Sequence, residues 1–280
     1  MKKNLRLGII SDLHLDVNEA AGKPVVETLV QVIESSAVDA VLIPGDISND
    51  YQKTLGYADR IESESGIPCY FVPGNHDLWN EAYPEKDAWE IYHELKRFKG
   101  NLINGPVEFP GGWVLVGDTG WYDYSFGGKG ITREAFDNMQ FEERVWQDKV
   151  NARWDRPTLE MHQYFLDKLE AQLKEWKGHK LILMTHVVPH DAFTVQQPNA
   201  MWYYLNAFLG GKSYGALVQK YKVRYAVFGH VHYRMTKTIE GTTYACRCLG
   251  THDEWGYFDG KTQTQQAVAD AFQVIDLEGS

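Results

Sequence analysis

Short apolar runs rich in valine, isoleucine and leucine recur along the chain, and stretches with helical periodicity separate them. Because these runs are short and bounded by turn residues, we predict strands over residues 5–11, 40–43, 69–72, 113–116, 180–185 and 225–228. We predict helices over residues 24–36, 51–64, 87–99 and 158–176. Strands that alternate with helices are typical of a parallel-rich α/β sheet with both faces covered. The segments 235–239, 242–248 and 271–277 look more like antiparallel hairpins.

Residues 119–157 do not follow this alternation, because their aromatic side chains lie among glycines and charged residues without a clean period. A length of 280 residues allows one large domain or two small ones. We expect a single domain over residues 1–280, in which 119–157 is an insertion or lid beside the functional site. Tyr122, Tyr124 and Trp202 are candidates for an apolar wall of that site, although aromatic side chains at such spacing more often belong to the core.

The formal net charge is −10, so the protein has no overall basic surface that would attract nucleic acid without sequence preference. A bound metal can still reverse the charge locally, so a nuclease is disfavoured but not excluded. No apolar stretch approaches the roughly 18 residues of a membrane span, and the apolar run 7–10 is too short for a signal peptide. The three cysteines suit a reducing compartment, so we expect a cytoplasmic protein without a membrane partner.

Side chains that can bind a metal ion follow five of the predicted strands: Asp12, His14, Asp46, Asn75, His186, His230 and His232. Ligand crevices of α/β sheets lie at the carboxyl ends of strands. In an extended chain residues i and i+2 share a face, so Asp12 with His14, and His230 with His232, can each converge on one spot. The set mixes carboxylate, amide and imidazole groups without a thiolate, which suits Mn, Fe, Zn, Co or Ni.

The motifs that contain these residues are DxH at 12–14, GD at 45–46, GNHD at 74–77, the lone His186, and GHxH at 229–232. In this order they resemble the five blocks of the calcineurin-like metallophosphoesterase family. The resemblance implies an α/β fold, a four-layer α/β/β/α sandwich of mixed sheets with a dinuclear metal centre at the carboxyl ends of the strands. It assigns Asp12, His14, Asp46 and His232 to one ion and Asp46, Asn75, His186 and His230 to the other, with Asp46 as the bridge. It also implies that His76 and its neighbour Asp77 are catalytic.

Two divalent cations would outweigh the two carboxylates and leave the site at roughly +2, which would attract a phosphate. We therefore expect a metal-dependent phosphoesterase that hydrolyses a phosphomonoester or phosphodiester of a small molecule or nucleotide with a metal-activated water. The alternative is a nuclease acting on DNA or RNA. A protein phosphatase is less favoured, because that branch of the family has a GDxVDRG block and residues 45–50 read GDISND, without the arginine. A scaffold is also less favoured, because all the ligands remain. His190 and His252 are weaker candidates for substrate contact.

Overall fold

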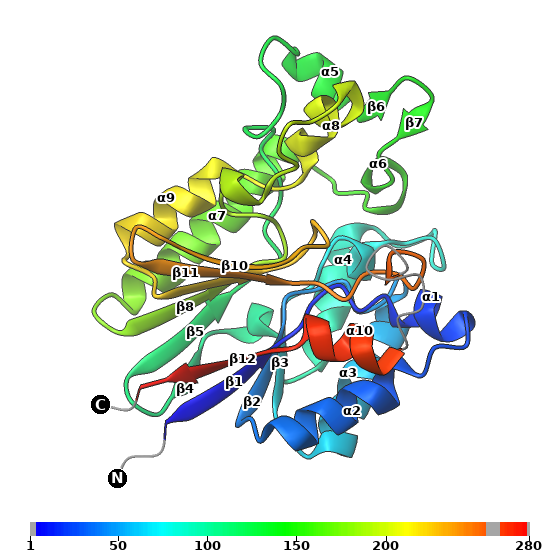
Figure 1. Cartoon of the computed structure of the whole chain (residues 1–280). Coiled ribbons are helices and arrows are strands. Elements are labelled where there is room, and N and C mark those ends of the chain that lie inside the picture. Colours follow the sequence, from blue (N-terminus) through cyan, green and yellow to red (C-terminus); the bar gives the residue numbers. More distant parts are fainter. Residues whose placement is uncertain (1–3, 256–263, 279–280) are drawn as a thin grey trace.

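Two β-sheets lie face to face in the computed structural model, which describes residues 4–255 and 264–278 (Figure 1). The first sheet has the strand order β12-β1-β2-β3. Strands β1, β2 and β3 are parallel, and β12 pairs antiparallel with β1. The strands are β1 (Leu5–Ile9), β2 (Ala40–Ile43), β3 (Cys69–Phe71) and β12 (Gln273–Leu277).

The second sheet has the strand order β10-β11-β9-β8-β5-β4. Its four central strands are parallel, whereas β4 and β10 pair antiparallel with their neighbours at the two edges. The strands are β4 (Val107–Phe109), β5 (Trp113–Gly117), β8 (Lys180–Met184), β9 (Tyr225–Phe228), β10 (Arg234–Ile239) and β11 (Thr242–Arg247).

Apolar side chains from both sheets form the central core. Leu7, Leu42, Leu115, Ile182 and Val227 belong to this cluster and are almost completely buried. All four residues of β2 are buried, which explains why its sequence is continuously apolar rather than alternating. The two sheets therefore form the inner layers of the molecule, each with one face against the other.

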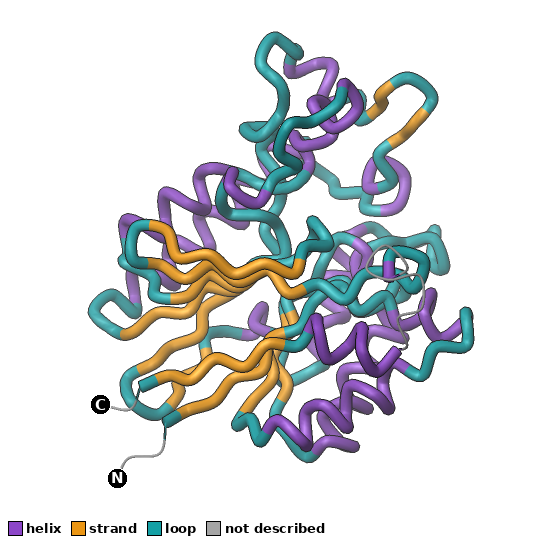
Figure 2. Tube along the Cα trace, viewed as in Figure 1, coloured by secondary structure: helices purple, strands orange, loops and turns teal. Residues whose placement is uncertain are grey.

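Helices cover the outer faces of both sheets (Figure 2). The first sheet is covered by α2 (Val25–Ser36), α3 (Tyr51–Ser65) and α10 (Thr264–Ala271), and the second by α7 (Thr158–Glu175) and α9 (Lys212–Lys220). Helix α3 begins at Asp50, whose carboxylate accepts hydrogen bonds from the amides of Gln52 and Lys53. This arrangement confirms the predicted four-layer α/β/β/α sandwich of mixed sheets.

Shorter elements connect these layers: α1 (Leu15–Ala20), α4 (Ala88–Glu94) and the 3₁₀ helices η1 (His76–Leu78), η2 (Leu95–Arg97), η3 (Leu102–Asn104), η4 (Asp191–Phe193) and η5 (Asn206–Phe208). The helices that the structure describes are all too short or too polar to traverse a lipid bilayer.

A lobe that protrudes above the second sheet contains most of segment 119–157 (Figure 1). The segment forms α5 (Arg133–Asp137), β6 (Gln140–Phe141), β7 (Arg144–Val145) and α6 (Asp148–Asn151), and α8 (Ala200–Leu205) packs beside it. Tyr204 of α8 links this helix to segment 119–157. Its hydroxyl donates to the carbonyl of Ala135 at 2.7 Å and accepts from the amide of Gln140 at 2.9 Å.

The prediction of antiparallel hairpins near the end of the chain is correct for two of the three segments. Strands β10 and β11 form an antiparallel hairpin. The segment 271–277, however, does not pair with them: β12 joins the other sheet beside β1, and the unpredicted helix α10 precedes it. Sheet membership depends on contacts between distant parts of the chain, which a local pattern does not report.

Candidate metal centre

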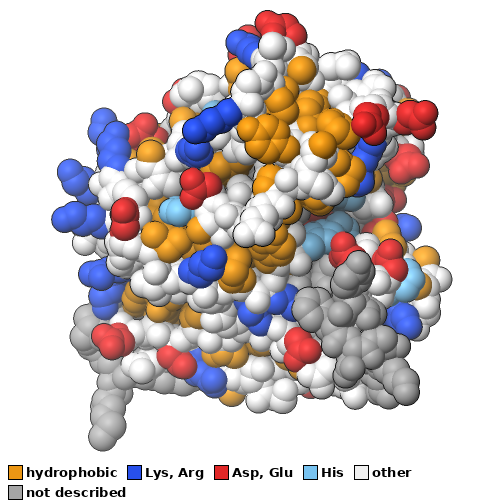
Figure 3. All heavy atoms as spheres, turned by 45° about the horizontal axis from the view of Figure 1, so that its top comes forward, with side chains coloured by type: hydrophobic (Ala, Val, Ile, Leu, Met, Phe, Trp, Pro, Cys, Tyr) orange, Lys and Arg blue, Asp and Glu red, His pale blue; other side chains and the backbone are white. Residues whose placement is uncertain are grey.

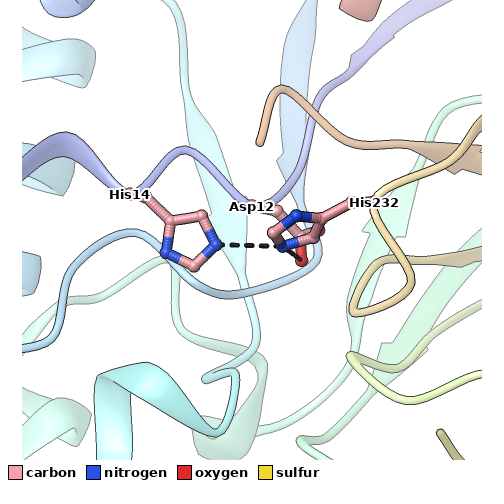
Figure 4. Close-up of side chains that lie close together, drawn as sticks. All are labelled: Asp12, His14 and His232. Atoms are coloured by element: carbon pink, nitrogen blue, oxygen red, sulfur yellow. Dashed lines mark hydrogen bonds and ion pairs between the residues drawn. The ribbon is translucent and has the colours of Figure 1, made fainter. Parts of the chain in front are cut away.

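The first group of predicted ligands lies where β1 and β9 end. Asp12 and His14 follow β1, and His232 lies in the loop after β9 (Figure 4). The Nε2 atoms of the two histidines are 3.1 Å apart, and Nε2 of His232 lies 3.5 Å from Oδ1 of Asp12. One potential ligand atom from each side chain therefore faces the same point.

The second group surrounds Nε2 of His186, which follows β8. This atom lies 3.3 Å from Oδ2 of Asp46, 2.9 Å from Oδ1 of Asn75 and 3.0 Å from Nδ1 of His230. All four side chains are buried or half-buried. The structure thus brings together an imidazole pair, a carboxylate and an amide oxygen from the ends of four strands.

Asp46 lies between the two groups. Its Oδ2 is 3.9 Å from Nε2 of His14 in the first group and 3.3 Å from Nε2 of His186 in the second. The carboxylate is almost completely buried. Asp46 is therefore placed where a residue shared by two ions would have to lie.

The backbone at these residues differs from the extended chain that the sequence predicted. Asp12, His14, Asp46, His230 and His232 all have positive φ angles, between 42° and 71°. Such a conformation is uncommon outside glycine and costs on the order of 1–3 kcal/mol per residue, so it persists where the surrounding structure enforces it. The expectation that His230 and His232 converge on one spot was wrong, because they lie in different groups.

Hydrogen bonds fix the ring orientation of three of the predicted histidine ligands. In each case the nitrogen that points away from the group contacts a protein oxygen, which leaves the other nitrogen directed at the group. The contacts are His186 Nδ1 to the carbonyl of Pro44 at 2.8 Å, His230 Nε2 to the carbonyl of Phe208 at 3.0 Å, and His232 Nδ1 to Oε2 of Glu254 at 2.7 Å.

The charge at the centre is suited to metal cations. Among the described residues, no lysine or arginine forms an ion pair with Asp12 or Asp46. Buried carboxylates are costly unless a cation or several hydrogen bonds compensate them. The converging carboxylate, amide and imidazole atoms therefore fit divalent metal ions, in agreement with the predicted type of site.

The pKa values of the histidines reflect a competition between burial and neighbouring carboxylates. Burial opposes protonation of His186, but the adjacent Asp46 outweighs burial and raises the pKa to about 10. Burial also opposes protonation of His232, and the hydrogen bond to Glu254 outweighs it and raises the pKa to about 9. Burial lowers the pKa of His230 to about 4. Without metal, the carboxylates are therefore compensated by protons on particular histidines.

His76 lies beside the two groups and faces Asp46. Its Nε2 is 4.0 Å from Oδ2 of Asp46, and its Nδ1 lies 2.8 Å from Oδ1 of Asn49. The ring lies against Trp79, with 3.7 Å between ring centroids, and burial lowers its pKa well below the usual value. The imidazole is thus held from two sides with one edge directed at the centre.

Asp77 lies behind the centre and is fully buried. Its carboxylate accepts hydrogen bonds from the amides of Asp46, Ile47 and Ser48, and also from the amide of Gly74 and the hydroxyl of Thr54. Burial, together with the Asp46 carboxylate, raises the pKa of Asp77, and the donors oppose that rise. These contacts direct the carboxylate at the backbone of the ligand loops and away from the pocket.

A cavity of about 680 Å³ opens onto the two groups and continues beneath the protruding lobe. In Figure 3 histidine side chains lie in a hollow beside a largely hydrophobic surface. The lobe contributes residues 143–148 and Trp202 to the wall, and Arg144 is its one cationic side chain among the described residues. The cavity is much larger than a phosphate group, and it combines an apolar wall with a single guanidinium.

Four of the weaker candidates do not line this cavity: Tyr122, Tyr124, His190 and His252. Tyr122 and Tyr124 are buried in the core of the lobe. The side chain of His190 accepts from the amide of Ala192 and lines a separate, smaller cavity. Trp202 does line the cavity, as expected. Sequence patterns did not indicate Glu254 or Asn49, which contact His232 and His76 from loops without a periodic signal.

Residues 5–234 match the family described as calcineurin-like phosphoesterase. UDP-2,3-diacylglucosamine hydrolase of Vibrio cholerae is 22% identical over 202 residues, which cover 66% of this chain and 73% of the relative. Protein L509 of Acanthamoeba polyphaga mimivirus is 21% identical over 277 residues, covering 90% of this chain and 94% of the relative. The solved phosphopantetheinyl hydrolase of Mycobacterium tuberculosis has a TM-score of 0.74 at 18% identity, with 94% and 95% of the two chains covered.

The family match spans the five motifs, and the structure brings their side chains together at the ends of the strands. The chain therefore belongs to the calcineurin-like phosphoesterase family and is a phosphoric ester hydrolase.

Proposed function

We propose that the protein hydrolyses a phosphomonoester or phosphodiester of a small organic molecule or nucleotide, using two divalent metal ions. Asp46, which lies between two groups of converging ligand atoms, supports a dinuclear centre. One ion would be held by Asp12, His14, Asp46 and His232, and the other by Asp46, Asn75, His186 and His230. When bound, the ions supply an activated water and positive charge on the phosphoryl oxygens. Mn, Fe, Zn, Co and Ni all suit the donor set.

His76 is proposed to act on the leaving group. The contact of Nδ1 with Asn49 holds the ring, and Nε2 faces the centre beside the cavity. An N–H group at Nε2 can protonate a departing alkoxide, or it can stabilise the developing charge by a hydrogen bond. We propose that Asp77 is a positioning residue rather than a reacting one, because its carboxylate is occupied by five donors.

The observation that favours a small organic phosphoester is the cavity beside the centre. Its volume of about 680 Å³ accommodates an organic group next to the phosphate. A nucleic acid would instead require several cations along its backbone, and the described wall has only Arg144 together with the acidic Glu143, Asp148 and Glu254. Two of the three proteins named above are, by name, a UDP-2,3-diacylglucosamine hydrolase and a phosphopantetheinyl hydrolase, which agrees with an organic phosphate.

A substrate screen tests this proposal. The Mn-loaded protein should cleave p-nitrophenyl phosphate, bis(p-nitrophenyl) phosphate or nucleotides faster than duplex DNA under identical conditions. Efficient cutting of DNA with negligible activity on the small esters would favour a nuclease instead. We also propose a cytoplasmic location, which rests on the three free cysteines and is tested by fractionation of the source cells.

A further inference from the structure

The side chain of the predicted ligand Asn75 contacts a buried carboxylate, that of Asp148. An asparagine amide has an oxygen that can bind a metal and a nitrogen that cannot, and the two ends have nearly the same shape. Oδ1 of Asn75 lies 2.9 Å from Nε2 of His186, whereas its Nδ2 donates to Oδ1 of Asp148 at 2.8 Å. Because an ionised carboxylate only accepts, Asp148 permits one orientation of the amide, with the oxygen directed at the metal centre.

Neutral hydrogen-bond donors hold the carboxylate of Asp148 in place beside Asn75. Asp148 begins α6 and is only 3% exposed, and no cation among the described residues pairs with it. Its charge is instead compensated by neutral donors. Besides Asn75, the indole nitrogens of Trp79 and Trp146 donate to its two oxygens at 2.8 Å each, and the hydroxyl of Tyr122 lies 3.4 Å away. Such a carboxylate has a fixed position and is costly to bury.

The same residue belongs to segment 119–157, outside the five family motifs. Backbone hydrogen bonds also join this segment to the loop after Asn75: the amide of Asn80 donates to the carbonyl of Asn151 at 2.8 Å, and that of Ala88 to the carbonyl of Arg153 at 2.9 Å. The insertion is therefore attached to the ligand loop at several points, and at one of them Asp148 contacts the side chain of the predicted ligand Asn75.

We propose that Asp148 is a positioning residue that presents the oxygen of Asn75 to the second metal ion and couples binding of that ion to the docking of segment 119–157. This rests on the proposed dinuclear function. The coupling is reciprocal: a docked insertion strengthens binding of the second ion, and the ion strengthens docking by the same factor. Binding of the second ion is thereby linked to the position of segment 119–157, which lines the cavity.

Asp148→Asn tests the proposal. When the oxygen of the new amide still faces Asn75, a neutral acceptor replaces a charged one and holds the Asn75 amide less firmly. When the NH₂ group faces Asn75, two donors oppose each other, and Asn75 gains by turning its own oxygen away from the centre. Loss of such an outer hydrogen bond typically weakens metal binding about 10–100-fold. In a calorimetric titration of the metal-free protein with Mn²⁺, one of the two binding events should be weakened by that factor and the other unchanged.

Asp137→Asn is the matched control, because Asp137 lies in the same insertion and accepts from the hydroxyl of Tyr124 at 3.0 Å, without contacting a predicted ligand. It should bind both ions as the wild type does. In the double variant Asp148→Asn with Asn75→Ala, loss of Asp148 should add nothing to the loss of Asn75.

The wild-type protein provides a second measurement that does not depend on the variant folding. Mn²⁺ should slow hydrogen exchange of the amides in residues 146–153. Unchanged exchange on metal binding, or an Asp148→Asn protein that binds both ions with wild-type affinity, would overturn the proposal. A wild type that binds fewer than two ions would instead refute the dinuclear function itself.

Discussion

Replacement of Asp77 by asparagine distinguishes a positioning role from a catalytic one. Oδ1 of this residue accepts from the amides of Ile47 and Ser48 and from the hydroxyl of Thr54, at 3.0, 3.1 and 2.6 Å. Oδ2 accepts from the amides of Asp46 and Gly74, at 2.8 Å each. In Asp77→Asn the NH₂ group must replace one of these oxygens, so at least two buried hydrogen bonds are lost.

Hydrogen bonds to a charged group contribute about 1.5–3 kcal/mol each, so the loss of two amounts to about 3–6 kcal/mol. A neutral amide is easier to bury than a carboxylate, which places the expected loss near the lower end. For a chain of this size, 1 kcal/mol corresponds to roughly 2–4 °C in Tm. The variant should therefore melt at least about 6 °C below the wild type, a large effect for a single substitution.

The assay is thermal unfolding of the metal-free proteins, because bound metal would add its own stabilisation. Thr54→Val provides a graded control: it removes one donor together with its single hydrogen bond to the carboxylate and should cost about 1.5–3 kcal/mol, half of the loss of two such bonds. An Asp77→Asn protein with unchanged Tm and metal content, but with greatly reduced kcat, would instead show that Asp77 takes part in the chemistry.

Three further predictions concern the centre. Asp46→Asn should lose affinity for both ions while the fold remains, and two ions retained at wild-type affinity would contradict its bridging position. His76→Ala should lower kcat/KM about 10²–10⁴-fold on an alkyl ester but much less on the p-nitrophenyl ester of the same phosphate type, and should keep both metals; equal losses would favour charge stabilisation over proton transfer. Because the pKa values of His186 and His232 are raised to about 10 and 9, both are protonated in the metal-free protein at pH 7.5. Metal binding should therefore release protons and strengthen as the pH rises toward 9; calorimetry in buffers of different ionisation enthalpy measures this release, and a heat independent of buffer would contradict it.

Most strands of the two sheets could be predicted because they have a strong local signal, whereas the short edge strand β4 was not predicted. Ala40–Ile43 is continuously apolar and fully buried, and the structure starts and ends the strand where the pattern does. Helix α7 likewise has a clear helical pattern of apolar residues over its eighteen residues. The position of β12 beside β1 could not be predicted, because their pairing joins the two ends of the chain. Helix α9, which covers the second sheet, is short and was not predicted.

The residues of the candidate site could be predicted from motif order, but not the conformation that brings them together. Residues i and i+2 share a face only in extended chain, whereas Asp12 and His14 have left-handed φ angles. Nor did the sequence indicate Glu254 or Asp148, whose contacts with His232 and Asn75 depend on how a loop and the insertion fold back over the ligands. The assignment of metals and catalytic roles stays a prediction.

A titration of the metal-free protein with Mn²⁺ tests whether hydrolysis requires two metal ions, with bound metal and hydrolysis of bis(p-nitrophenyl) phosphate and p-nitrophenyl phosphate followed together. We expect no hydrolysis without metal and full activity only when two ions are bound per chain. Hydrolysis by the metal-free protein, or full activity with a single ion bound, would contradict this expectation.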